Sequence, residues 1–143
     1  MIMKGLVWEL ASKLNDNTQI DKLNGMVGGL LPSDYIDCVL ENNAGYPSLN
    51  TFENQTGTQH VFNNLLPLDD SEDENIFNIY LFISEETERK DILPFARDSF
   101  GNYICFDFSG HPATVVFWNH ETNDIDIVCE SFTDLINMLH KAE

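Results

Sequence analysis

The chain has 143 residues, of which 24 are Asp or Glu and 7 are Lys or Arg, and its formal charge is -17. Nucleic acids and anionic membranes bind proteins through Lys and Arg, so this charge excludes both as natural partners and favours a basic protein instead. A hydrophobic fraction of 43% excludes a disordered chain and predicts a single domain over residues 1–143 with one core.

The cysteines are odd in number and lack the paired spacing of a disulfide framework or a zinc site. They are Cys38, Cys105 and Cys129, and each lies in an apolar run, where a buried thiol is expected. The N-terminal residues carry no secretory signal, and no apolar run is long enough to span a membrane. We therefore expect a cytoplasmic protein.

The first part of the chain predicts two helices. Apolar residues from Leu6 to Leu14 are spaced as on one face of a helix, and the polar segment 15–17 is expected to end it. A glycine-rich connector follows. The second helix is predicted to begin at Ser33, an N-cap preceded by Pro32, and to end at 42–45. The residues expected on its buried face are Ile36, Val39 and Leu40.

The middle of the chain predicts a hairpin, a loop and a helix. Residues 49–68 alternate loosely between polar and apolar side chains, which predicts two short strands joined near Gly57. Residues 69–74 are too acidic to pack and are expected to form a solvated loop or the start of a helix. The apolar residues from Ile76 to Ile83 follow a helical spacing, although strand-forming residues are dense there, and we predict a helix.

The second half predicts strands joined by tight turns, followed by a helix. Strands are expected at 92–96, 103–108, 114–118 and 125–129, with turns at 98–102 and 109–112. Pro94 suits a sheet edge or the start of a strand, and Ile125, Ile127 and Cys129 are expected to line one face. Ser131 is expected to cap a terminal helix over 132–139. This order predicts an α+β domain with a mainly antiparallel sheet, helices packed on one side, and a C-terminal helix.

Enzymatic chemistry has little support in the sequence. No nucleotide-binding or serine-nucleophile motif occurs, and residues 69–74 lack the Gly and Glu that a calcium-binding loop requires. A hydrolase or metal-dependent enzyme would use His120, Glu121 and Asp107, and we rank this alternative last. Asp98 and Asp107 are expected to accept backbone hydrogen bonds near a turn. We therefore expect no enzyme, no metal and no cofactor.

Three sequence features occur in a recognisable order. They are LPSDY at 31–35 with NAGYP at 43–47, then LPFARD at 93–98 with GN at 101–102 and CFD at 105–107, and finally VVFWNHE at 115–121. In order and spacing they resemble the SUKH superfamily over residues 30–141. One departure is Ala44, where members of this superfamily often have Gly.

The resemblance implies a function in protein binding. Many bacterial SUKH proteins are immunity proteins that neutralise a toxin, often a nuclease, whereas other members are interaction scaffolds. We therefore expect a bacterial cytoplasmic immunity protein that binds a cognate toxin of a polymorphic or contact-dependent system, with a basic nuclease domain as the toxin. The alternative is a non-enzymatic interaction or regulatory scaffold of the same fold, which needs no toxin gene beside its own.

Charge suggests where such a partner would bind. A nuclease site is basic because it holds phosphates, so acidic segments are expected to steer toward it and to dock on it. The alternative for each acid is that it is solvated and only keeps the protein soluble. The many Phe residues fit either a core or a dimer face, which leaves the oligomeric state open. The expected contact residues are Asp69, Asp70, Glu72, Asp73, Glu74, Glu85, Glu86, Asp124 and Asp126.

Overall fold

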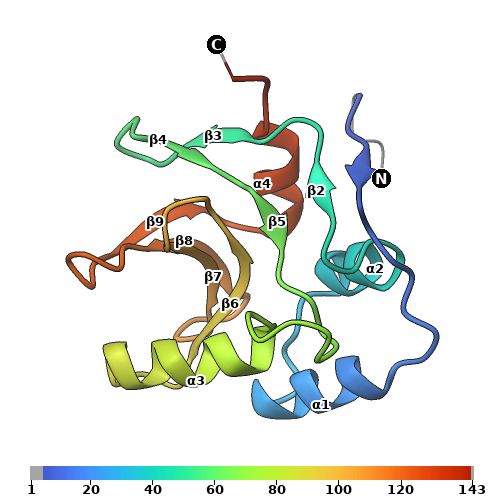
Figure 1. Cartoon of the computed structure of the whole chain (residues 1–143). Coiled ribbons are helices and arrows are strands. Elements are labelled where there is room, and N and C mark those ends of the chain that lie inside the picture. Colours follow the sequence, from blue (N-terminus) through green and yellow to red (C-terminus); the bar gives the residue numbers. More distant parts are fainter. Residues whose placement is uncertain (1–4, 143) are drawn as a thin grey trace.

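The computed structural model describes residues 5–142 (Figure 1). Its helices are α1 (Thr18–Met26), α2 (Ser33–Glu41), α3 (Ile76–Thr87) and α4 (Phe132–Met138). Its strands are β1 (Trp8–Glu9), β2 (Tyr46–Pro47), β3 (Thr51–Glu53), β4 (Gln59–Val61), β5 (Asn64–Leu65), β6 (Ile92–Arg97), β7 (Tyr103–Asp107), β8 (Thr114–Trp118) and β9 (Ile125–Cys129). Within this part of the chain, no helix is both long and apolar enough to cross a membrane.

The central feature is a five-stranded sheet with the order β5-β6-β7-β8-β9, in which neighbouring strands are antiparallel. The strands β7 and β8 are rich in β-branched and aromatic residues, which pack well on a pleated surface. Tyr103 lies opposite Trp118, and Phe106 lies opposite Val115. Two smaller antiparallel pairs, β1–β2 and β3–β4, complete the arrangement. The predicted α+β class and antiparallel sheet are confirmed.

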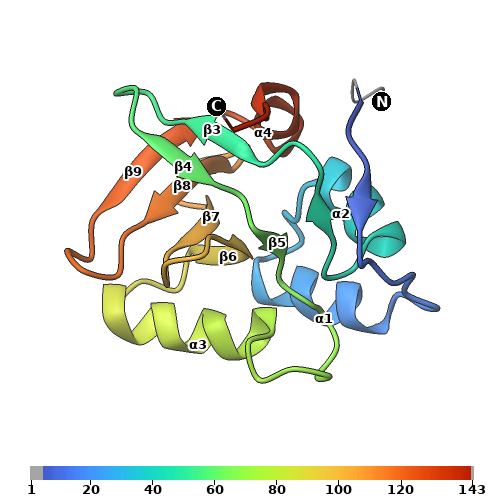
Figure 2. The ribbon, with the colours of Figure 1, turned by 45° about the horizontal axis from the view of Figure 1, so that its top comes forward.

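Helices cover both faces of this sheet rather than one (Figures 1 and 2). On the face that carries Tyr103 and Trp118, the ring of Phe82 from α3 packs edge-on against Trp118 at 5.7 Å. Because side chains alternate along a strand, Phe106 points to the opposite face. There, Tyr35 of α2 contacts Phe106 with ring centroids 5.4 Å apart. Both faces carry large aromatic side chains, so each needs a covering layer.

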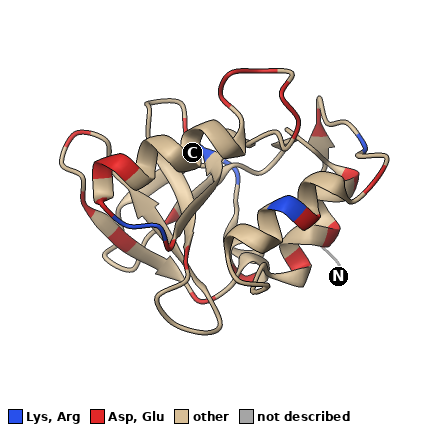
Figure 3. Ribbon diagram, turned by 90° about the horizontal axis from the view of Figure 1, so that it is seen from below, with Lys and Arg blue, Asp and Glu red and all other residues tan. Residues whose placement is uncertain are grey.

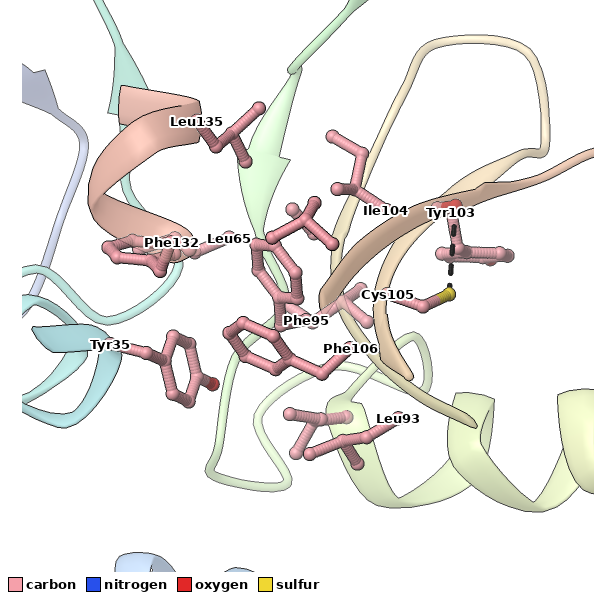
Figure 4. Close-up of a cluster of buried hydrophobic side chains, with 14 of the residues drawn as sticks. Tyr35, Leu65, Leu93, Phe95, Tyr103, Ile104, Cys105, Phe106, Phe132 and Leu135 are labelled. Carbon is pink, nitrogen blue, oxygen red and sulfur yellow. Dashed lines mark hydrogen bonds between the residues drawn. The ribbon is translucent and has the colours of Figure 1, made fainter. Parts of the chain in front are cut away.

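Aromatic rings form the centre of the core between the sheet, α2 and α4 (Figure 4). Phe95 stacks on Phe106 with ring centroids 4.2 Å apart. Tyr35 and Phe132 lie 5.6 Å from each other and approach Phe95 at 5.7 and 5.6 Å. Each such ring removes about 150–250 Å² from water when buried, so this cluster joins the two helices firmly to the sheet.

The predicted first helix is wrong. Residues 8–9 form β1 and pair with β2, so their backbone groups bond to a neighbouring strand. Leu10 has a φ of 56° and is 85% exposed, so the apolar spacing does not mark a buried face. The helix begins later, at Thr18, after the polar segment that was expected to end one. Asp16 accepts a hydrogen bond of 3.0 Å from the Thr18 amide at this start.

The sequence predicted the positions of α2, the β3–β4 hairpin and α3 correctly. The N-cap of α2 is Pro32 rather than the expected Ser33, which is the first residue of the helix. Ala44 follows α2 with a φ of 63°, in the segment that was expected to end this helix in a left-handed conformation. Gly57 lies in the hairpin turn, where the two strands were expected to join, and has a φ of 86°. The buried face of α2 differs from the prediction, since Ile36 and Leu40 are only partly buried. The residues of α2 that are buried are Tyr35, Cys38 and Val39.

The strands of the second half also lie where predicted, with two local differences. β6 is inside the sheet, and its Pro94 lies at a register shift, beyond the two residues paired with β5, where its missing amide is tolerated. Ile127 was expected on a buried face with Ile125 and Cys129. It is 53% exposed because β9 is an edge strand. Ser131 caps α4 as predicted and accepts a backbone hydrogen bond of 3.0 Å.

Candidate functional site

The acidic residues expected to contact a partner gather mainly around α3 (Figure 3). Residues 68–75 form the loop that leads into this helix, and Glu85 and Glu86 lie near its C-terminal end. The helix has 12 residues, which at about 1.5 Å each give a length of about 18 Å. One acidic group therefore lies at each end of α3, in the red segments of Figure 3.

The loop before α3 is held by the helix cap. The side-chain oxygen of Asn75 accepts hydrogen bonds from the amides of Phe77 and Asn78 at 3.1 and 3.0 Å. Its side-chain nitrogen donates to the carbonyl oxygen of Glu72 at 2.9 Å. An ordered loop presents its charges in a fixed position, which lowers the entropy cost of binding. Its exposed acids, referred to as the loop acids, are Asp70, Glu72 and Asp73.

The two other acids of this loop, Asp69 and Glu74, are engaged within the chain. Glu74 accepts hydrogen bonds from the Tyr103 hydroxyl and from the Arg97 guanidinium, with which it forms an ion pair. Burial and the neighbouring Glu74 carboxylate raise the pKa of Tyr103. Asp69 accepts a hydrogen bond of 3.1 Å from the side-chain amide of Asn43. Both carboxylates therefore tie the loop to the rest of the domain.

At the other end of α3, Asn123 joins the helix to the β8–β9 turn. Its side-chain nitrogen donates to the carbonyl oxygen of Glu86 at 2.7 Å, and its side-chain oxygen accepts from the indole nitrogen of Trp118 at 2.7 Å. Asn123 has a φ of 62°, a conformation that Asn tolerates better than most residues. The adjacent Asp124 is thereby held beside the helix end that carries Glu85 and Glu86.

Exposed apolar side chains lie next to these acids. Leu81 is 60% exposed and Phe82 is 45% exposed. On a helix, residues three and four positions apart are neighbours, so both lie beside Glu85 and Phe82 also lies beside Glu86. A protein-binding patch commonly has an apolar centre and a polar rim, and this area has both. We name it the α3 surface, and it comprises Leu81, Phe82, Glu85, Glu86 and Asp124.

Asp126 lies apart from the α3 surface. It is paired with Phe117, and directly opposed residues of an antiparallel pair point to the same face. The ring of Phe117 stacks on His60 of β4 at 3.8 Å, on the side away from α3. The fold therefore brings Glu85, Glu86 and Asp124 together but places Asp126 on the opposite side of the sheet.

The arginines are used in internal ion pairs. Arg89 contacts Asp91 and Asp107, each at 2.9 Å, and the hydrogen bond with Asp91 raises the pKa of the guanidinium. Arg97 pairs with Glu74. The ammonium of Lys22 lies 4.4 Å from the centre of the Phe77 ring. Each arginine is therefore already paired with acids of this chain, and neither pairs with the loop acids or with an acid of the α3 surface.

The thiols fit structural roles. Burial raises the pKa of Cys38 to about 12 and the pKa of Cys129 to about 11, and it raises the pKa of Cys105 well above its usual value. The thiolate is the reactive form of cysteine, so these environments disfavour a nucleophile. The predicted buried thiols are confirmed for Cys38 and Cys105, and Cys129 is partly buried.

The residues considered for catalysis do not converge. The ring nitrogen Nδ1 of His120 lies 2.6 Å from the side-chain oxygen of Asn102, at the end of β7 where Tyr103 begins the strand. Asp107 ends the same strand, roughly 13 Å away at the usual rise per residue, and binds Arg89. Among residues 5–142, no group of three or more His, Cys, Asp or Glu side chains is arranged to hold a metal ion.

The two motif aspartates satisfy backbone donors, as expected. Asp98 Oδ1 accepts hydrogen bonds from the amides of Phe100 and Asn102 at 2.8 and 2.9 Å, which closes the turn before β7. Asp107 accepts from the amide of Ser109 at 2.9 Å after the strand. These residues therefore determine turn geometry at the two ends of β7.

The sequence interpretation missed three residues of this region. Leu81 and Phe82 belong to an apolar run that is expected to be core. Only the packing of α3 shows that Leu81 is exposed and that Phe82 leaves part of its ring exposed while the ring contacts Trp118. Asn123 was not singled out. Its position within an Asn-Asp turn between two strands was the available signal, since Asn favours turns with positive φ.

The comparison with known families agrees with the resemblance carried by the motifs. The sequence pattern of the SMI1 / KNR4 family (SUKH-1) matches residues 15–138, which cover α1 to α4. No curated protein matches the chain significantly. The family match covers most of the chain and includes each of the three motif regions. The chain therefore belongs to the SMI1 / KNR4 family (SUKH-1).

Proposed function

We propose that this chain is an immunity protein that binds and neutralises a cognate toxin. The toxin is a basic nuclease domain of a bacterial polymorphic or contact-dependent system, and the encounter takes place in the cytoplasm. Membership of the SUKH-1 family supports a protein-binding role of this kind. The chain itself acts by occupation of the toxin surface and uses no catalytic residue or cofactor.

The observation that carries this proposal is the composition of the α3 surface. Leu81 and Phe82 are exposed beside Glu85, Glu86 and Asp124, and the Asn123 hydrogen bonds hold the acids in place. Exposed apolar side chains supply binding energy when they are buried against a partner. The surrounding acids select a partner with basic charge and speed its approach.

The loop acids extend this surface along α3 toward its N-terminal end. Asp70, Glu72 and Asp73 are exposed there, about one helix length from Glu85. Asp69 and Glu74 support the loop from inside, and their contact with the toxin is the least favoured part of the proposal. Asp126 faces another side of the sheet, where it adds to the long-range field that attracts a basic protein.

Inhibition follows from the chemistry that a nuclease needs. A nuclease holds phosphates with basic side chains, and an acidic surface competes for the same groups. Once the α3 surface is docked, the bulk of the domain blocks the nucleic acid from reaching that cleft. Charges at the rim mainly raise the association rate, whereas the apolar centre slows dissociation.

The test uses the protein encoded by the adjacent gene. Its toxic domain is expressed alone and together with this chain, and growth is measured. Wild type is expected to restore growth and to form a complex with the purified domain. Glu85→Lys/Glu86→Lys is expected to lower the association rate at least about tenfold at low salt, and Phe82→Ala to raise the dissociation rate.

The control is Glu9→Lys/Asp21→Lys, which makes the same change in charge at exposed acids near the N-terminus. It is expected to protect cells like wild type, because it leaves the α3 surface intact. If the adjacent gene product is harmless, or is toxic but does not bind, the immunity function is wrong. Binding of a harmless client through the same surface would identify a scaffold instead.

A further inference from the structure

A groove lies between α2 and the start of α4, across the sheet from the α3 surface. It consists of two adjoining cavities of about 520 and 370 Å³ that share Ser33, Asp34 and Phe132. Cavities that bind small ligands or single side chains commonly have volumes of about 300–1,000 Å³. We name it the α2–α4 groove. Its smaller cavity is lined by Ser33, Asp34, Asp37, Cys38, Glu41, Asn42 and Phe132.

The floor of the groove is apolar. Phe132 lines both cavities and is almost completely buried by its contacts with Tyr35 and Phe95. Cys38 lies beside it with a neutral thiol, because burial raises its pKa to about 12. Such a floor accepts methylene groups and offers no charge of its own.

The wall on the α2 side carries three carboxylates on one face of the helix. Asp34, Asp37 and Glu41 are spaced by three and four positions, so they form one row. Asp34 is fixed, since its Oδ2 accepts hydrogen bonds from the Thr133 amide at 2.9 Å and the Thr133 hydroxyl at 2.7 Å. The other two carboxylates are exposed at the mouth.

These outer carboxylates are available to a ligand. Within residues 5–142, the side-chain carboxylate of Asp37 is exposed and makes no hydrogen bond or ion pair. The Glu41 carboxylate lies 3.7 Å from the Lys13 ammonium. Both side chains are largely exposed, so this ion pair is weak and does not prevent Glu41 from binding a ligand. No Lys or Arg in the described part of the chain lines either cavity. The groove therefore combines an apolar floor with uncompensated negative charge.

We infer that the α2–α4 groove receives an arginine side chain presented by a protein partner. An anion is repelled by the row of carboxylates, and a purely apolar group would desolvate them without compensation. The arginine stem lies along the floor, and the guanidinium reaches Asp37 and Glu41 at the mouth. A guanidinium is more weakly hydrated than an ammonium and has five donors in a plane, so it suits this mixture better than lysine does.

The inference is tested with small probes on the full chain. Nα-acetyl-arginine amide is titrated while the backbone amide signals are followed by NMR, with the citrulline and lysine amides as matched probes. The expected result is saturable shifts at Cys38, Asn42 and Phe132 with the arginine probe, and at least threefold weaker binding of the other two. Asp37→Asn/Glu41→Gln is expected to raise the dissociation constant about three- to tenfold, as for two exposed ion pairs.

The control variant is Glu72→Gln/Asp73→Asn, which removes two exposed acids elsewhere and is expected to bind like wild type. Equal binding of the citrulline probe would show that charge is not recognised, and equal binding of the lysine probe would exclude the guanidinium. Either result overturns the inference. It is also overturned if the NMR shifts centre on the loop acids, or if the shifts do not saturate as the arginine probe is added. Because no toxin is needed, the result is independent of the immunity function.

Discussion

The side chain of Asn123 bonds simultaneously to the carbonyl oxygen of Glu86 and to the indole nitrogen of Trp118, with both distances at 2.7 Å. One residue of the β8–β9 turn thus connects the end of α3 to the sheet strand beneath it. Trp118 is almost fully buried, so its indole donor needs a partner inside the protein. The position of the acids on the α3 surface depends on this connection.

Replacement of Asn123 with Gly is expected to lower the free energy of unfolding by about 1–3 kcal/mol, because the buried indole donor loses its acceptor. Gly is chosen because it adopts the positive φ of this position without strain. Its greater freedom in the unfolded chain contributes about 0.4–1 kcal/mol of the loss, and the hydrogen bonds contribute the rest. Urea denaturation followed by circular dichroism measures it. A change below about 0.5 kcal/mol would mean that water replaces the side chain fully.

Glu74 is expected to be a structural acid, in contrast to the neighbouring Asp73. Glu74→Ala removes the acceptor of the Tyr103 hydroxyl and the ion-pair partner of Arg97, which keeps its hydrogen bond to Asn64. It is expected to destabilise the domain by about 1.5–3 kcal/mol, the range for hydrogen bonds to charged groups. Asp73→Ala removes an exposed acid and is expected to change stability by less than about 0.5 kcal/mol. Thermal and urea denaturation of both variants provide the comparison. Equal stabilities would contradict the role of Glu74.

The sequence predicts elements well where the local signals agree with the packing. Ser131 caps α4, Gly57 turns the β3–β4 hairpin, and the strands of the second half are separated by recognisable turns. The N-terminal segment fails for a physical reason. Its helical spacing is real, but β1 pairs with β2, and Trp8 packs against Phe62 with ring centroids 5.9 Å apart. Such distant contacts override local propensity.

The candidate site is predictable in its charge but not in its geometry. Composition alone indicates an acidic surface, yet it cannot show that Glu74 pairs with Arg97, which lies 23 positions later. Asp124 and Asp126 are two positions apart, a spacing that suggests one shared face of a strand. Asp124 instead precedes β9, and only Asp126 takes part in the alternation, so the two acids separate.

Ala44→Gly is expected to stabilise the domain slightly. Ala44 has a φ of 63°, and a left-handed conformation costs a residue with a Cβ roughly 1–2 kcal/mol. The greater freedom of Gly in the unfolded chain offsets about 0.4–1 kcal/mol of that gain, which leaves a net increase of about 0.5 kcal/mol. Urea denaturation measures it. The neighbouring Gly45→Ala provides the contrast and is expected to destabilise, because its Cβ would lie 2.9 Å from the Asn42 carbonyl oxygen.

Tyr35→Phe is expected to leave stability unchanged or to raise it by up to about 1 kcal/mol, since the buried hydroxyl has no hydrogen-bond partner within residues 5–142. The ring keeps its contacts with Phe95, Phe106 and Phe132 in this variant. Tyr35→Ala removes those contacts and is expected to cost about 3–5 kcal/mol. A loss of more than about 1 kcal/mol in Tyr35→Phe would show that the hydroxyl binds a buried water.

His60 is expected to make the domain less stable at acidic pH. Its ring stacks on Phe117, and burial lowers its pKa, although the charges of Asp98 and Asp126 oppose this shift. In the unfolded chain His60 takes up a proton at a higher pH than in the folded domain, near 6.5. The stabilisation is therefore present above about pH 6.5 and is lost as the pH falls toward the lower folded-state pKa.

His60→Phe isolates this effect because it keeps an aromatic ring on Phe117 and removes the titrating group. The free energy of unfolding is measured for wild type and variant at pH 7.5, 6.5 and 5.5. Other titrating groups act on both proteins alike, so the difference between the two curves reports His60 alone. Wild type is expected to lose stability relative to the variant as the pH falls. Parallel curves would mean that the His60 ring is protonated equally well in the folded and unfolded states.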